Sequence, residues 1–323
     1  MVDGADDRPR SHGSRLPPSN SGSAKRHHLV SRGYQAAWSD DGRRIVLVTK
    51  ATSEAKVVGL KSAFVARHLL TFRTAAGASD ALEVEFGKVE SRCIPQLQRF
   101  IQGARDEAAE LAVRAITALH WARGLSTIET QRRIASETRE EWVARVENDD
   151  ELRHAFVADR GRLPVPGEME QLLEEQFDLW DRWNGFFVER VQVHYNTALS
   201  HLQTLGSQRF ECARPSRAEF VFADSPVVVT DGLRGTARRP VGLYEATSIW
   251  FPLSPSVGVA LTQVPHAPAE VRLPPIGVQE RNLLSWRFAA ERLGARPGSD
   301  LDRAFGNRQG GIRVEVTPTT PIA

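Results

Sequence analysis

The sequence has few cysteines and no long apolar run. Cys93 and Cys212 are the only cysteines among 323 residues, which excludes the disulfide framework of small secreted proteins. We expect both to be reduced thiols in a cytoplasmic protein. No stretch approaches the roughly 18 apolar residues of a membrane-spanning helix. The formal net charge of only +2 indicates neither broad nucleic-acid binding nor binding to a membrane surface.

Familiar catalytic and metal-binding motifs are also missing. The chain contains no P-loop, GxGxxG, HExxH, GxSxG or CxxC pattern. No two of its nine histidines lie three or four positions apart, which is the spacing that would place two ligands on one helical face. The sequence therefore contains no motif of defined spacing that predicts a reaction or a cofactor.

The composition divides the chain into three parts. Residues 1–24 are rich in Ser, Gly, Pro and Arg and cannot bury enough apolar surface to fold, so we predict a disordered tail. Residues 25–305 are expected to form a single domain. Residues 306–323, with their Thr-Pro repeats, are expected to form a flexible C-terminal tail.

The local patterns predict an α+β fold. A short N-terminal hairpin, a central helical region with one long helix, and a C-terminal, mostly antiparallel sheet with a final helix are expected in that order. Pro95 predicts a kink or break in the first long helix, and Asp80 with Glu83 has the spacing of a capping box. The expected strands are 44–49, 55–60, 209–213, 219–223, 227–230, 248–251 and 257–261, and the expected helices are 80–100, 106–123, 128–146, 168–205 and 279–293.

Four separated segments resemble one family. They are the stretch from Lys25-Arg26-His27-His28 to Trp38, the helix from Asp80 to Pro95, His120-Trp121-Ala122-Arg123, and Phe220 to Val228 with Ile249 to Pro255. In this order they are similar to the bacterial family called domain of unknown function 4238. The resemblance covers residues 25–295 and implies a fold and a bacterial, cytoplasmic setting. It implies no established activity.

Six polar residues are candidates for a site, and each has a structural alternative. His27 could act as a base or ligand, or pin the first ordered segment. Asp224 could be a catalytic carboxylate at a strand end, or a turn cap. Arg123 could bind an anion, or its positive charge could interact favourably with the dipole at the C-terminal end of its helix. The others are Glu83 and Glu90, which lie two helical turns apart and could help to hold a divalent metal or form a solvated edge, and Asn282, which could bind substrate or backbone.

Two functions of different classes follow from these candidates. The first is an interaction or regulatory protein that binds a protein partner or forms a homodimer through the helix Phe177–Leu202, which would then expose an apolar patch. The alternative is a nuclease-like hydrolase of phosphoesters, with or without a divalent metal. It requires His27, Glu90, Arg123 and Asp224 to converge in one cleft. Because no spaced motif supports catalysis, the interaction hypothesis is preferred.

Overall fold

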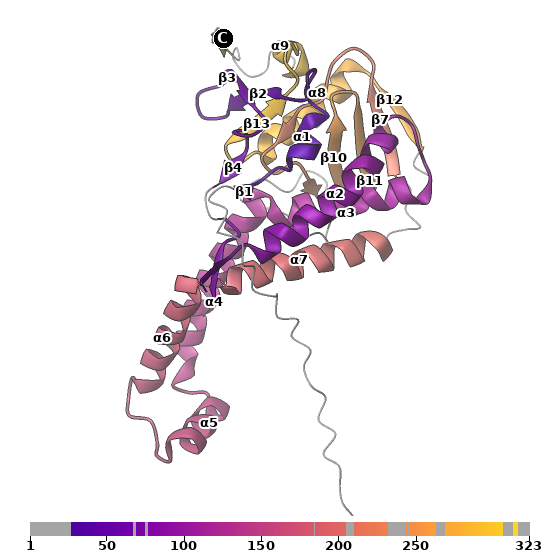
Figure 1. Ribbon diagram of the computed structural model, residues 1–323. Coiled ribbons are helices and arrows are strands. Elements are labelled where there is room, and N and C mark those ends of the chain that lie inside the picture. Colours follow the sequence, from indigo (N-terminus) through magenta and orange to yellow (C-terminus); the bar gives the residue numbers. More distant parts are fainter. Residues whose placement is uncertain are drawn as a thin grey trace, which may run out of the picture.

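The computed structural model describes residues 27–66, 69–74, 77–183, 185–204, 210–231, 243, 246–262, 269–305 and 313–315. Figure 1 shows a body of sheets lying on a layer of helices, from which a helical arm projects. The predicted α+β class is confirmed. Residues 1–24 lie outside the described residues, as does most of the predicted C-terminal tail.

The N-terminal hairpin is the centre of a five-stranded sheet with the order β14-β3-β2-β13-β8. The hairpin is antiparallel and in full register, with Arg44 opposite Gly59 and Thr49 opposite Glu54. Its strand-rich sequence and the preceding Asp-Asp-Gly turn specify it locally, whereas its other neighbours come from the distant C-terminal part of the chain. The strands are β2 (Arg44–Thr49), β3 (Glu54–Gly59), β8 (Phe222–Ala223), β13 (Arg292–Ala295) and β14 (Arg313–Glu315).

A second five-stranded sheet has the order β12-β7-β11-β10-β9. All of its pairs are antiparallel except β12 with β7. The predicted C-terminal, mostly antiparallel sheet therefore agrees with the structure. Its strands are β7 (Phe210–Pro215), β9 (Val228–Thr230), β10 (Ser248–Ser254), β11 (Val257–Thr262) and β12 (Glu270–Leu273). Two small ribbons pair β1 (His27–His28) with β4 (Val65–Ala66), and β5 (Phe72–Thr74) with β6 (Gly77–Ser79).

Helices α2, α3 and α7 pack side by side beneath the sheets (Figure 1). None of the helices in the described part of the chain combines the length and the apolar character needed to cross a bilayer. The helices are α1 (Arg32–Ala36), α2 (Ala81–Ile101), α3 (Glu107–Arg123), α4 (Leu125–Val146), α5 (Asp150–Arg160), α6 (Glu168–Trp183), α7 (Gly185–Thr204), α8 (Pro275–Phe288) and α9 (Leu301–Phe305).

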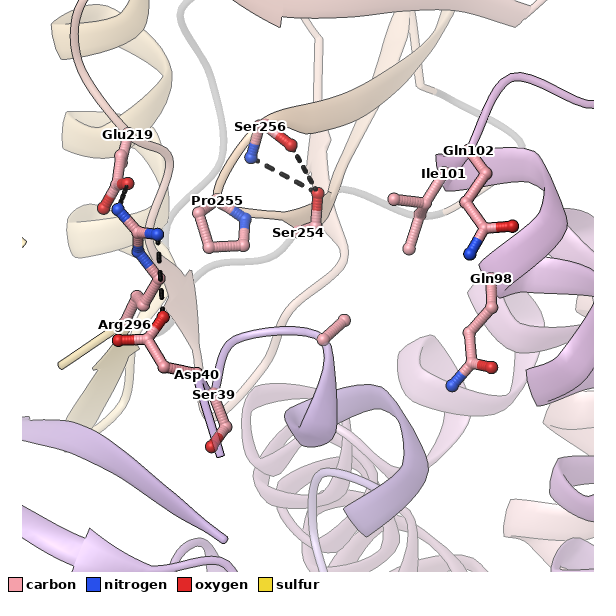
Figure 2. Close-up of a pocket in the computed structure, with 11 residues that line it drawn as sticks. Ser39, Asp40, Gln98, Ile101, Gln102, Glu219, Ser254, Pro255, Ser256 and Arg296 are labelled. Atoms are coloured by element: carbon pink, nitrogen blue, oxygen red, sulfur yellow. Dashed lines mark hydrogen bonds and ion pairs between the residues drawn. The ribbon is translucent and has the colours of Figure 1, made fainter. Parts of the chain in front are cut away.

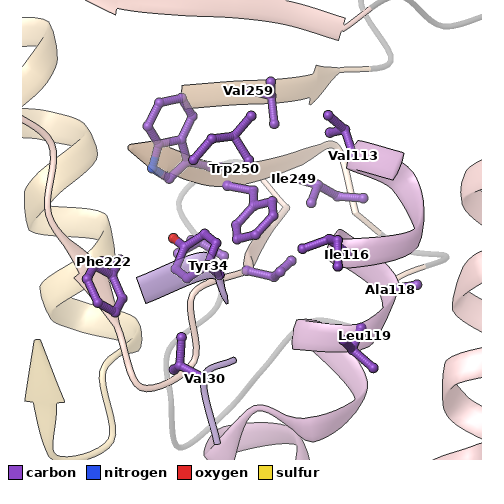
Figure 3. Packing of buried hydrophobic residues seen from close by; sticks show 14 of the residues in the cluster. Val30, Tyr34, Val113, Ile116, Ala118, Leu119, Phe222, Ile249, Trp250 and Val259 are labelled. Carbon is purple, nitrogen blue, oxygen red and sulfur yellow. The ribbon is translucent and has the colours of Figure 1, made fainter. Parts of the chain in front are cut away.

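The main core lies between α3 and the second sheet, where Tyr34 of α1 is inserted (Figure 3). The Tyr34 ring stacks on Phe251 with centroids 5.3 Å apart, and Phe222 meets its edge at 5.4 Å. Its hydroxyl donates a hydrogen bond to the carbonyl of Pro252, so the one polar atom of the ring is satisfied. This residue joins the N-terminal segment to both sheets.

The helix predicted over 168–205 corresponds to α6 and α7. α6 reaches Trp183 and α7 starts at Gly185, and the residue between them, Asn184, lies outside the described residues. α6 belongs to the arm and α7 to the helical layer (Figure 1).

Three smaller expectations also differ from the structure. The last long helix ends at Phe288, and Leu293 lies in β13, because the chain turns to join the first sheet. The predicted break at Pro95 is absent, since the loss of one backbone hydrogen bond is outweighed by the burial of Leu97 and Phe100; the alternative of a kink stays a prediction. The predicted flexible tail contains β14, which is paired in parallel with β3.

Candidate functional site

Arg123 occupies the centre of a charged cluster between α2 and α3. Its side chain is 1% exposed, and its Nη1 donates to Glu90 Oε1 at 2.7 Å. Its Nη2 lies 3.8 Å from Glu83 Oε1. The seven-residue spacing of the two glutamates places them on one face of α2, as expected, and that face meets the end of α3.

Two carboxylates thus face one guanidinium. Burial is the main cause that raises the pKa of Glu90; Arg123 opposes the shift and Glu83 adds to it. Among the described residues, Glu83 Oε2 and Arg123 Nε are buried without a hydrogen-bond partner. A phosphate group here would meet two carboxylates and a guanidinium that is already occupied, so this arrangement does not favour phosphoester binding.

His27 belongs to a separate buried network. Its Nδ1 accepts a hydrogen bond from the Leu70 backbone N–H at 2.8 Å, and its Nε2 lies 3.3 Å from Asp80 Oδ1. Thr71 donates to the same Asp80 oxygen at 2.6 Å. These contacts join β1 to the segment before α2, which matches the pinning alternative. They also explain why Asp80 does not cap α2 as its spacing with Glu83 predicted: its carboxylate is used elsewhere.

Asp224 and Asn282 bind backbone groups. The Asp224 carboxylate accepts hydrogen bonds from the N–H groups of Ala290, Glu291 and Arg292 at 2.7–2.9 Å. Burial raises the pKa of Asp224, and these three bonds oppose the rise. Asn282 accepts from the Val221 N–H and donates to two carbonyls. Asp224 therefore secures the turn between α8 and β13, whereas Asn282 joins α8 to the segment before β8 and to α9.

The expected convergence of His27, Glu90, Arg123 and Asp224 is only partly present. Glu90 and Arg123 are in contact, and some sequence neighbours of the candidates also meet. The Ser31 N–H donates to His120 Nε2, and Ser225 lies against Gly124. The four side chains, however, point into three different networks. Among the described residues, no group of His, Cys, Asp and Glu is arranged to hold a metal ion.

The four sequence segments that suggested a family now have a structural context. They form β1 with α1, α2, the end of α3, and the strands β8 to β10, which together enclose the Arg123 cluster and the core around Tyr34. The model of a family described as protein of unknown function (DUF4238) matches residues 26–293. The chain belongs to the DUF4238 family. No curated protein and no solved structure matches this DUF4238 chain. Its bacterial origin and cytoplasmic location stay predictions.

The expected docking face on Phe177–Leu202 is not an exposed apolar patch among the side chains that the structure describes in this DUF4238 protein. On α7, Val188, Val191, Ala198 and Leu202 are buried in the main core, and Tyr195 is only 9% exposed. The side chains of residues 176–187 lie outside the described residues. The apolar stripe seen in the sequence on this helix serves packing against α3, because α7 is the third helix of the layer.

Exposed apolar side chains gather instead on the arm formed by α4, α5 and α6. Of the ten large apolar side chains that the described residues expose, five lie between residues 142 and 172. These residues were not predicted from the sequence, because α4 is highly charged and α5 has no clear helical pattern of apolar residues. The signal that was available is the Leu163-Pro164-Val165-Pro166 loop, whose apolar residues flank prolines in an otherwise polar region. The five residues are Trp142, Leu152, Leu163, Val165 and Leu172.

Proposed function

We propose that this protein is an interaction protein that associates with a second copy of itself through the tip of its arm. The observation that carries the proposal is the exposure of apolar side chains at that tip. Leu163 is 71% exposed, Val165 58% and Trp142 55%. A cluster of this kind on a projecting element is typical of a protein-binding surface.

The arm does not use these residues for its own stability. It has a small core of Val146, Phe156 and Met169, with Leu173 packed against it. Polar contacts hold it further: Arg139 of α4 binds Glu174 of α6, and Asp149 caps α5 by accepting the Leu152 N–H at 3.0 Å. The structure of the arm is thus accounted for without Trp142, Leu163 and Val165, which leaves them free for a partner.

Charge indicates which partner. Residues 125–183 contain 15 Asp and Glu against 8 Lys and Arg, whereas the rest of the chain contains 25 Asp and Glu against 34 Lys and Arg. The arm is therefore acidic and the body basic. A second copy of the chain offers the arm a surface of opposite charge, which would steer the encounter and favour this partner.

The experiment compares two valines of equal chemistry and similar exposure. Val165 on the arm is 58% exposed and Val193 on α7 is 60% exposed. We expect the wild-type protein to show twice the chain mass of 35.8 kDa by light scattering at high concentration. Val165→Ser, combined with Leu163→Ser, should shift the protein to the monomer mass, and Val193→Ser should not. Urea unfolding verifies that all variants are folded.

Two results would contradict the proposal. A monomer mass for the wild type across the whole concentration series would remove self-association. Dissociation by Val193→Ser, with the Leu163 and Val165 variant still associated, would move the interface to α7, where the sequence first suggested it.

A further inference from the structure

A second feature, independent of the arm, is a crevice of about 360 Å³ in the body. Five separate segments line it: the loop after α1, the end of α2, the loop before β8, the turn between β10 and β11, and the residue after β13 (Figure 2). Its size lies within the range of small-molecule pockets, roughly 300–1,000 Å³. None of the residues discussed as candidates from the sequence lines it.

One wall of the crevice holds one cation and two carboxylates, which gives it a net charge of −1. Arg296 binds Glu219 through Nη2, and its Nη1 lies 3.6 Å from Asp40 Oδ1. Ser299 donates to the second oxygen of Glu219 at 2.6 Å. An anionic ligand would find the guanidinium occupied and two carboxylates beside it. Both Glu219 oxygens are already bound, by Arg296 and Ser299, so they are not open to a cationic ligand.

The opposite wall is neutral and able to form hydrogen bonds. Gln98 and Gln102 lie one turn apart near the end of α2, and their carboxamides face the crevice across from Arg296 and Asp40 (Figure 2). Within the described residues neither carboxamide has a hydrogen-bond partner. Each can both donate and accept, which is the combination that a hydroxyl group requires.

The floor between the walls combines hydroxyl groups and small apolar surfaces. Ser254 and Ser256 place their oxygens 3.4 Å apart in the β10–β11 turn, and Pro255 lies between them. Ile101 contributes an apolar side chain from α2. Such a floor suits a molecule that carries C–H groups on one face and hydroxyls around its edge.

We propose that this crevice binds an uncharged, hydroxyl-rich small molecule of about the size of a monosaccharide or disaccharide. The net charge of −1 on the charged wall disfavours anionic ligands, the Glu219 carboxylate is already bound, and the two carboxamides supply the main hydrogen bonds. The proposal does not depend on self-association through the arm, since the two surfaces share no residues.

The test uses three compounds that share a pyranose ring and differ in charge: glucose, glucosamine and glucuronate. Binding to the full-length protein is measured by saturation-transfer NMR and by titration calorimetry, with maltose as a larger neutral probe. We expect a neutral sugar to bind, glucuronate to bind at least about threefold more weakly, and glucosamine to bind no more tightly than glucose, because Glu219 is already bound. Gln98→Ala and Gln102→Ala should each weaken binding by up to about tenfold, which corresponds to the loss of one hydrogen bond.

Two further variants sharpen the test. Gln96→Ala changes the same residue type on the same helix outside the crevice and should bind sugar like the wild type. Ser256→Trp, at an exposed turn position, should block the crevice without disturbing the core. Absence of binding by any neutral sugar, tighter binding of glucuronate or glucosamine than of glucose, or unchanged binding by the Gln98 and Gln102 variants would each overturn the proposal.

Discussion

At the scale of single residues, His120 shows how burial fixes a protonation state. Its ring is buried beside Tyr34, with centroids 4.9 Å apart, and Nε2 accepts the Ser31 N–H at 3.2 Å. Nδ1 lies 3.1 Å from the Ile116 carbonyl, which fits a neutral ring with its proton on Nδ1. Burial, aided by the positive charge of Arg123, lowers the pKa of His120 from 6.5 to about 3. The folded protein thus holds this imidazole neutral.

This neutral histidine predicts a loss of stability in mild acid. Below pH 6.5 the unfolded chain takes up a proton on His120, whereas the folded protein does not until the pH approaches about 3. The free energy of unfolding should therefore fall as pH falls, by about 1.4 kcal/mol per pH unit from this residue. Urea unfolding of the wild type and of His120→Gln between pH 8 and 5 measures the effect.

The two stability curves should be parallel above pH 7 and should converge by about 2 kcal/mol between pH 6.5 and 5. The comparison with the variant is necessary because the raised pKa values of Glu90 and Asp224 act in the opposite direction in both proteins. Curves that remain parallel down to pH 5 would show that His120 is charged in the folded protein.

At the scale of elements, each of the two five-stranded sheets contains a glycine covered by an aromatic ring. In β13, a Cβ added to Gly294 would lie 2.2 Å from Cζ of Phe222. In β11, a Cβ added to Gly258 would lie 2.1 Å from Cη2 of Trp250. Phe222 and Trp250 are both buried, so neither ring has room to move aside. The strands can approach their neighbours this closely only because these positions have no side chain.

A matched pair of glycine substitutions tests this packing. Gly294→Ala should lower the free energy of unfolding by about 1–3 kcal/mol, because the methyl group overpacks the core against Phe222. Gly87→Ala, on α2 with nothing within 4 Å of the added carbon, should raise it by about 0.5–1 kcal/mol through helix propensity. Chemical denaturation monitors both. Equal changes in the free energy of unfolding for the two substitutions would mean that the Phe222 ring can move aside to make room for the methyl group.

At the scale of the whole molecule, charge is distributed unevenly between body and arm. The acidic arm projects from the basic body, so its charges lie where a second copy can reach them (Figure 1). Long-range attraction of this kind acts over about 10 Å at 0.1 M salt and over about 3 Å at 1 M. Apolar contacts at the tip are not weakened by salt in the same way.

Self-association should therefore weaken as salt is added. Raising the ionic strength from 0.05 to 0.5 M should increase the dissociation constant of the dimer by roughly tenfold, measured by sedimentation equilibrium. The Leu163→Ser, Val165→Ser variant serves as the control, because a monomer should show no salt-dependent change in mass. A dimer that becomes tighter with salt would indicate an interface that depends on apolar contacts alone.

Local patterns were sufficient where neighbouring residues decide the structure. The hairpin β2–β3 and the helices α3 and α4 follow from alternation, turn residues and helical spacing, and the structure confirms them. The α+β class and the family also followed from the order of such segments. The strand β13 was missed because helical spacing from Leu283 to Leu293 does not show where the chain turns to join the first sheet.

The sequence by itself determined the hairpin β2–β3, the helices α3 and α4 and the α+β class, because those choices depend on interactions over a few residues. Only the tertiary structure decided what each polar side chain does. Arg123 reaches Glu83 and Glu90 across two helices, Asp224 turns to the backbone of 290–292, and Arg296 is neutralised by Asp40 and Glu219. These partners lie from about thirty to more than two hundred residues away in the chain. Charge and hydrogen bonding act through space, so no pattern along the sequence records them.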